Sequence, residues 1–151
     1  MLMLAACTTV LPVARPNIYV MRHLQKAPGP DPVLSQEGQL FAARLIDRFK
    51  DDPPSAIYVS ATRRAQMTAA PLAARLGIMP KIYDPADTPG LVARVKSEPG
   101  TVLIVGHSNT VPDIVEQLGG PRPSDIAEDR FGDIWHVSGT RPKVTQDRLS
   151  L

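Results

Sequence analysis

Three short apolar runs constrain the fold of this chain more than any other feature of its sequence. They are residues 17–21 (NIYVM), 56–60 (AIYVS) and 101–106 (TVLIVG). Each run is almost continuously hydrophobic and does not alternate between polar and apolar residues. This pattern is typical of strands in a parallel sheet that is covered on both faces. The three runs therefore predict the central strands of a buried, mostly parallel sheet.

A segment with helical periodicity follows each of these runs. The three segments are residues 35–50, 64–77 and 109–120. Ser35 is a suitable N-cap for the first helix. In the second, Pro71 predicts either a kink or a helix whose regular part begins near the proline. Each predicted strand is thus paired with a helix that can cover the sheet.

The remaining segments extend the same alternation of strands and helices. Residues 81–87 predict a short fourth strand, residues 88–100 a helix, and residues 130–139 an edge strand rich in β-forming residues. Alternating elements of this kind predict an α/β fold, with three α/β/α layers and a mostly parallel central sheet. Right-handed crossovers would bring the carboxyl ends of the parallel strands to one edge.

Size and charge limit the classes of function. A chain of 151 residues fits one domain with its own core. The formal net charge is +2, from 17 basic and 15 acidic residues, so nothing in the charge predicts a partner such as nucleic acid. The single cysteine, Cys7, excludes an intrachain disulfide and a thiolate metal cluster.

The first residues differ in character from the rest of the chain. We expect residues 1–15 to be an apolar segment with a linker, and residues 16–151 to form the domain. Leu4–Cys7 (LAAC) resembles the lipobox of bacterial lipoproteins, in which the cysteine is lipidated. Only six residues precede Cys7, fewer than a signal peptide needs, so either translation starts upstream or the match is chance. The resemblance implies a lipid anchor in the periplasm or outer membrane; otherwise the protein would be cytoplasmic.

Basic side chains stand where the predicted strands end. Arg22 and His23 close the first run, His107 closes the third, and Arg63 and Arg64 open the helix after the second. Taken singly, each has an ordinary explanation as a solvated or hydrogen-bonded surface residue. In open α/β sheets, however, ligands bind at the carboxyl ends of the strands. The coincidence of these residues at one edge therefore predicts an anion pocket.

Phosphate is the anion that best suits such a pocket. Arginine offers paired donors to phosphoryl oxygens. A neutral imidazole can attack phosphorus and carry the phosphoryl group covalently, which divides hydrolysis into two easier steps. The surrounding cations would stabilise the charge of the transition state, so the predicted mechanism needs no metal ion and no other cofactor.

The residues at these positions resemble the histidine phosphatase superfamily, the phosphoglycerate-mutase-like clan. The resemblance is carried by several motifs in the family's order. They are residues 21–23 (MRH), 31–45 (DPVLSQEGQLFAARL), 60–73 (SATRRAQMTAAPLA), 102–110 (VLIVGHSNT) and 131–137 (FGDIWHV). The resemblance implies a phosphoglycerate-mutase-like fold, here with a minimal cap because the chain is short.

The resemblance also implies roles for individual residues. His23 would be the nucleophile, Arg22 and Arg64 phosphate ligands, and His107 the second catalytic and substrate-binding histidine. The sequence departs from the family pattern at Leu24, where the family has glycine. The family's carboxylic general acid has no clear counterpart.

Two aspartates are candidates for that general acid. Asp84, and as an alternative Asp87, lie between the second arginine and the second histidine. Both also suit an ordinary structural part as turn or helix-cap carboxylates beside prolines.

These features predict a metal-independent phosphatase that acts through a phosphohistidine. Its substrate would be a phosphorylated small molecule or a phosphoprotein, including phosphohistidine. A mutase is less favoured, because reorienting a bisphosphate calls for a closed cavity. The alternatives from other classes are a non-catalytic phosphate-binding module and a phosphorelay partner of the same fold. The sequence leaves the oligomeric state open.

Overall fold

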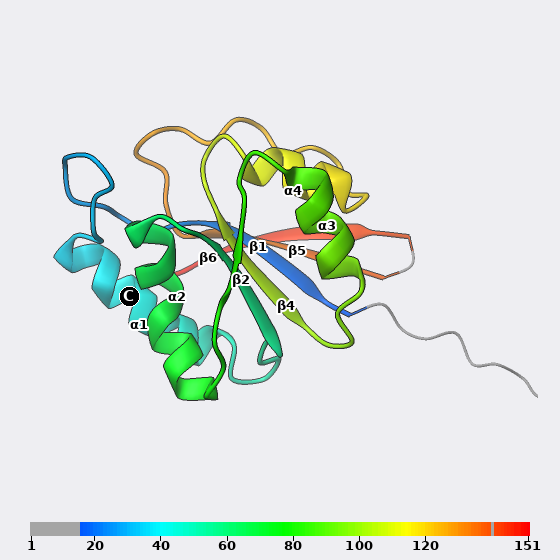
Figure 1. The fold of residues 1–151 in the computed structure, drawn as a ribbon, viewed down its shortest axis with the longest axis horizontal. Coiled ribbons are helices and arrows are strands. Elements are labelled where there is room, and N and C mark those ends of the chain that lie inside the picture. Colours follow the sequence, from blue (N-terminus) through cyan, green and yellow to red (C-terminus); the bar gives the residue numbers. More distant parts are fainter. Residues whose placement is uncertain (1–15, 140) are drawn as a thin grey trace, which may run out of the picture.

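A six-stranded sheet forms the centre of the protein. The computed structural model describes residues 16–139 and 141–151. The strands are β1 (Ile18–Arg22), β2 (Ala56–Ser60), β3 (Lys81–Tyr83), β4 (Val102–Gly106), β5 (Asp133–Ser138) and β6 (Lys143–Arg148). Their order is β3-β2-β4-β1-β5-β6 (Figure 1). The first four pair in parallel, whereas β5 and β6 are antiparallel to their neighbours.

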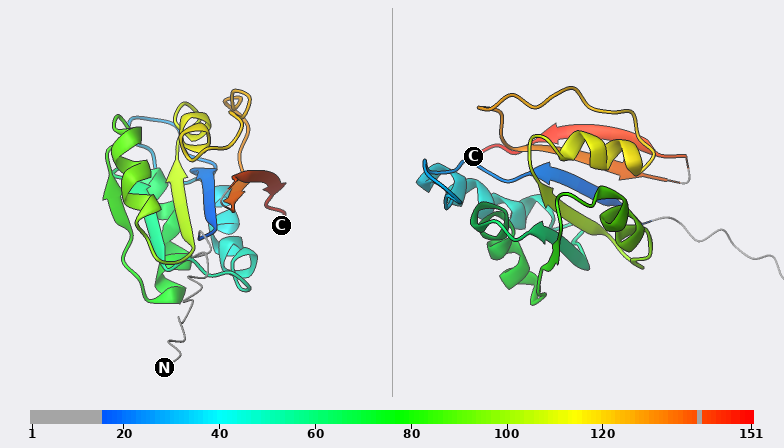
Figure 2. Two further views of the ribbon diagram at one scale, coloured as in Figure 1. Left: turned by 90° about the vertical axis from the view of Figure 1, so that its right-hand side faces the viewer. Right: turned by 45° about the horizontal axis from the view of Figure 1, so that its top comes forward.

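Helices cover both faces of this sheet. They are α1 (Gln36–Arg48), α2 (Arg63–Leu76), α3 (Thr88–Lys96) and α4 (Val111–Gln117). Side chains of α1 and α2 share one apolar cluster with the sheet, and those of α3 and α4 share a second cluster. Figure 2 shows the two helix pairs on opposite sides of the strands. The predicted three-layer α/β/α architecture with a mostly parallel sheet is confirmed.

One of the two alternatives for α2 is excluded, and the expectation about β5 was wrong. Helix α2 starts at Arg63, where Thr62 caps it, and Pro71 lies within it, so the helix does not begin near the proline. The predicted edge strand, β5, lies between β1 and β6. Strand β6 was not predicted because its sequence, KVTQDR, is polar and largely exposed. Charged side chains on an exposed outer strand protect a sheet from pairing with other chains.

The strand register sets the position of the predicted site. Arg22 of β1 pairs with Gly106 of β4, and the next backbone amide, that of His23, donates to the carbonyl oxygen of Gly106 at 2.9 Å. His23 and His107 therefore leave the sheet side by side. On the other flank of β4, Val59 pairs with Val105, which brings Ser60 to the same level.

Two predictions concern the membrane and the N-terminus. In residues 16–139 and 141–151, no helix is both long and apolar enough to span a bilayer. Cys7 and the lipobox-like segment lie outside the described residues. The lipid anchor and the location in the periplasm or outer membrane stay predictions from the sequence.

Candidate active site

His23 is buried at the carboxyl end of β1 with one ring nitrogen engaged. Only 3% of the residue is exposed, and its Nδ1 lies 2.9 Å from the carbonyl oxygen of Leu24. Because a carbonyl oxygen only accepts, Nδ1 carries the hydrogen in this contact. The neutral ring then has its lone pair on Nε2. This tautomer presents Nε2 as a nucleophile.

Leu24 fits into the core at the position where the resemblance implied a glycine. Its side chain is fully buried in the core, and its amide donates to Oγ1 of Thr68 at 3.0 Å. Among the described residues other than glycine, only Asp31 has a positive φ. The backbone at Leu24 therefore does not need the conformational freedom of glycine. Leu24 instead anchors the turn that supports His23.

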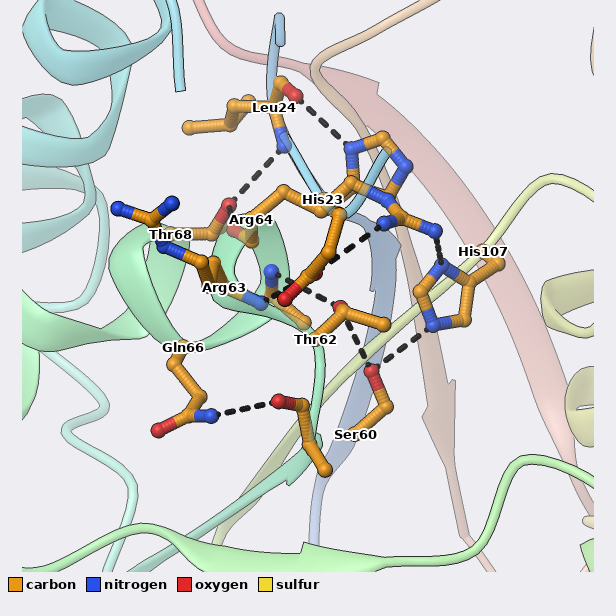
Figure 3. Close-up of polar contacts among 12 residues, drawn as sticks. His23, Leu24, Ser60, Thr62, Arg63, Arg64, Gln66, Thr68 and His107 are labelled. Carbon is orange, nitrogen blue, oxygen red and sulfur yellow. Dashed lines mark hydrogen bonds and ion pairs between the residues drawn. The ribbon is translucent and has the colours of Figure 1, made fainter. Parts of the chain in front are cut away.

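His107 faces His23 across the end of the sheet. The two ring centroids are 5.4 Å apart. Nε2 of His107 lies 2.8 Å from Oγ of Ser60, and Nδ1 lies 3.5 Å from Nη2 of Arg64. Figure 3 shows the guanidinium of Arg64 beside both imidazole rings. The backbone amide of His107 donates to Oγ1 of Thr110 at 3.0 Å, which fixes the turn into α4.

The two arginines predicted to bind phosphate both reach this site. Arg64 comes from the first turn of α2, and its Nη1 is 3.8 Å from Oδ1 of Asp31. The neighbouring Arg63 is exposed, and its backbone amide donates to the same carboxylate oxygen at 3.0 Å. Arg22 and Arg64 each have a buried Nε without a hydrogen-bond partner in the described part of the chain. A bound oxyanion would supply acceptors for such donors.

Arg22 also ties a loop to the site. Its Nη1 lies within 3.0 Å of the carbonyl oxygens of Ala127, Glu128 and Arg130. The guanidinium lies over the ring of Phe131, at 4.1 Å from the centroid. The same ring is 6.0 Å from that of His23. The segment between α4 and β5 is thereby held against the site as a wall.

Burial keeps both histidines neutral. It lowers the pKa of His23 to about 3, with further lowering from the charges of Arg22 and Arg64. It lowers the pKa of His107 to about 4, assisted first by Arg64 and then by Arg22. Both imidazoles therefore carry a free lone pair at neutral pH, although two guanidinium groups lie beside them.

Sequence reasoning placed the main residues correctly in one region but missed their supports. Ser60 at the end of β2 contacts His107, and Asp31 and Phe131 in loops contact Arg64 and Arg22, yet single residues of these kinds gave no separate signal. Asp84 is exposed, and its Oδ1 accepts the amide of Ala86 at 2.9 Å. Its role as general acid stays a prediction.

The second candidate for the general acid, Asp87, has a structural contact of its own. Asp87 caps α3 by accepting the amide of Gly90. The described contacts link neither Asp84 nor Asp87 to the two histidines. Among residues 16–139 and 141–151, no group of three or more histidine, cysteine, aspartate or glutamate side chains is arranged to hold a metal ion.

Comparisons with known proteins point to one family. The sequence profile described as histidine phosphatase superfamily (branch 1) matches residues 18–86, which include Arg22, His23 and Arg64. Over these residues the chain is similar to the histidine phosphatase superfamily. A sequence search of curated proteins returned no match.

Solved structures share the fold over nearly their whole length. The protein histidine phosphatase SixA complexed with tungstate has a TM-score of 0.71 at 18% identity, covering 87% of this chain and 96% of its own. A SixA described as a putative phosphohistidine phosphatase, from Agrobacterium tumefaciens, has a TM-score of 0.65 at 20% identity, covering 91% and 99%. A mycobacterial glucosyl-3-phosphoglycerate phosphatase has a TM-score of 0.69 at 16% identity, covering 88% and 97%.

The buried neutral histidines predict a specific loss of stability in acid. In the unfolded chain a histidine binds a proton near pH 6.5, whereas folded His23 stays neutral down to about pH 3. Below pH 6.5 the unfolded state therefore binds more protons, and stability falls as the pH falls. We expect His23→Asn to reduce the slope of unfolding free energy between pH 6 and 4 by about 1.4 kcal/mol per pH unit. Urea unfolding of the wild type and of His23→Asn between pH 6 and 4 measures these slopes. Equal slopes would contradict the buried neutral state of His23.

Proposed function

We propose that this protein is a metal-independent phosphatase that works through a covalent phosphohistidine at His23. The observation that carries the proposal is the free Nε2 lone pair of His23 among the donors of Arg22 and Arg64. A neutral imidazole held by its other nitrogen, at the hydrogen bond to Leu24, is oriented for attack on phosphorus. His107 also lies beside guanidinium groups, but its Nε2 contacts Ser60 and its Nδ1 contacts Arg64.

The arginines supply the positive charge that phosphoryl transfer needs. As Nε2 of His23 approaches phosphorus, negative charge spreads over the equatorial oxygens. Arg64 lies beside both imidazole rings, and Arg22 has an Nε donor without a partner among the described residues. Fixed donors in a buried site stabilise this charge without reorganising. The proposal therefore assigns to the two arginines the part that metal ions play in many other phosphatases.

The substrate is a phosphomonoester or a phosphohistidine. Between α2 and β4 the chain forms only β3 and α3, so no large insertion covers the carboxyl edge of the sheet. An uncovered edge suits a phosphorylated side chain of a protein or varied small phosphoesters. Two structural neighbours carry names of phosphohistidine phosphatases and a third that of a sugar-phosphate phosphatase, and these names agree with either choice.

Replacing the nucleophile tests the covalent step. We expect the wild type to release phosphate from p-nitrophenyl phosphate in the presence of EDTA. His23→Ala should lower kcat by about 10³-fold or more, because the covalent step has no substitute. Acid-labile label from a radioactive phosphoryl donor should appear on the wild-type chain only. His136→Gln, which alters the third histidine outside the site, is the matched control and should keep turnover.

The competing functions give different results in the same assay. A phosphate-binding module would show a phosphate-dependent rise in melting temperature and no turnover. A phosphorelay partner would accumulate a phosphoenzyme that does not release phosphate. Wild-type turnover that EDTA abolishes would contradict the metal-independent mechanism.

The two adjacent arginines provide a matched pair for testing the phosphate ligands. Arg64→Ala removes a guanidinium beside His107 and should lower kcat/KM by about 10²–10³-fold, the usual cost of one donor to a transition-state oxyanion. Arg63→Ala removes an exposed side chain and keeps the backbone amide that binds Asp31, so kcat/KM should stay within about threefold. Steady-state kinetics on both variants measures the difference, and similar losses would mean that Arg64 does not bind the phosphoryl group.

A further inference from the structure

Two contacts indicate which nitrogen of His107 carries the hydrogen. Nδ1 lies 3.5 Å from Nη2 of Arg64, and Nε2 lies 2.8 Å from Oγ of Ser60. A guanidinium only donates hydrogen bonds, so a hydrogen on Nδ1 would set two N–H donors against each other. The neutral ring therefore carries its hydrogen on Nε2 and donates it to Ser60. Its lone pair lies on Nδ1, toward Arg64.

The hydrogen bonds beyond Ser60 support the same direction. Oγ of Ser60 lies 3.0 Å from Oγ1 of Thr62, which also accepts the amide of Ala65 as the N-cap of α2. A Ser60 hydroxyl that accepts from His107 is free to donate its own hydrogen to Thr62. Ser60 is fully buried, so its hydroxyl has no water with which to exchange these partners. The cap of α2 and the ring of His107 are thus joined by one directed chain.

With this tautomer, His107 presents a hydrogen-bond acceptor to the site, whereas the neighbouring arginines present donors. The charged and titratable groups around it are Arg64 from α2, Arg22 at the end of β1 and His23, the next residue. The arginines offer only donors, and Asp31 is the carboxylate that contacts Arg64. A phosphoryl dianion offers only acceptors and would face the lone pair of Nδ1. A monoanion offers one P–OH group, which Nδ1 can accept.

We propose that Ser60 is a positioning residue that holds His107 as a proton acceptor, and that the enzyme therefore reacts with the monoanion of its phosphoryl substrate. The proposal rests on the function proposed above and extends it by naming the reactive form of the substrate. The monoanion also brings the proton that the leaving group needs. This explains how the site operates without a carboxylic acid in contact with either histidine.

The proton balance of the first step is complete. The bond from Nε2 of His23 to phosphorus forms as the bond from phosphorus to the leaving oxygen breaks. The P–OH proton passes to Nδ1 of His107 and from there to the leaving oxygen, which departs as a neutral alcohol or phenol. The phosphoryl group remains on His23 as –PO₃²⁻ on a ring that keeps its Nδ1 hydrogen and is now cationic. The total charge of −1 is the same before and after the step.

Nuclear magnetic resonance tests the tautomer directly. The chain has three histidines, so the ring nitrogen signals of a ¹⁵N-labelled sample are few and can be assigned with His107→Gln. At pH 7 we expect His107 to be neutral with its hydrogen on Nε2. In Ser60→Ala the signals should shift toward a mixture of tautomers, whereas Ser108→Ala, a matched control in the next turn, should leave them unchanged. A hydrogen on Nδ1 in the wild type would overturn the proposal.

The pH dependence of turnover tests the catalytic consequence. The second pKa of a phosphate monoester is near 6, so wild-type kcat/KM should fall about tenfold per pH unit above that value. The break should lie at lower pH for p-nitrophenyl phosphate than for phenyl phosphate, whose phosphate is the weaker acid. In Ser60→Ala, kcat at pH 5 should fall about tenfold with little change in KM, and the decline at high pH should become shallower. Ser60→Thr, which keeps the hydroxyl, should restore the wild-type profile.

Results that would overturn this inference differ from those that would overturn the proposed function. This inference would be overturned if wild-type kcat/KM began to fall at the same pH with p-nitrophenyl phosphate and with phenyl phosphate. It would also be overturned if the pH profile of Ser60→Ala equalled that of the wild type. Either result would leave the proposed function standing. Absence of turnover in the wild type at every pH would overturn the proposed function and the catalytic part of this inference together.

Discussion

The pairing of β1 with β4 is the constraint on which the site depends. Arg22 lies opposite Gly106, and the amide of His23 continues the ladder by donating to the Gly106 carbonyl. A shift of one residue would turn every side chain of the shifted strand to the opposite face of the sheet and separate His23 from His107. The buried apolar residues of both strands fix this register, because they must face the two helix layers. The core thus determines the geometry of the two histidines.

Burial and positive charge act together on this pair. Removal from water and the nearby guanidinium groups both lower the pKa of each imidazole, so neither ring needs a separate base to free its lone pair. In the arrangement that we propose, the contact of His23 with Leu24 and the contacts of His107 with Ser60 and Arg64 set opposite tautomers in the two rings. The first ring exposes Nε2 for attack, and the second exposes Nδ1 for a proton. In this proposal, two neighbouring histidines thus have different roles, one as nucleophile and one as proton acceptor.

The sequence predicted the elements whose burial imposes a pattern and missed those without one. The three apolar runs became β1, β2 and β4, and Ser35 caps α1 as expected. The polar strand β6 has no apolar face to reveal it, so β5 was taken for an edge. Basic residues at strand ends pointed to the site because parallel strands end together. The role proposed for Ser60 depends on its contact with His107, which is 47 positions away in the sequence. No local sequence pattern predicts such a contact.

A complex with orthovanadate tests the central claim most directly, because vanadate adopts the five-coordinate geometry of phosphoryl transfer. The account predicts vanadium at bonding distance from Nε2 of His23, with its oxygens accepting hydrogen bonds from Arg22 and Arg64 and a protonated oxygen facing Nδ1 of His107. Vanadate bound away from His23, or bound there with Arg64 turned to solvent, would contradict the account.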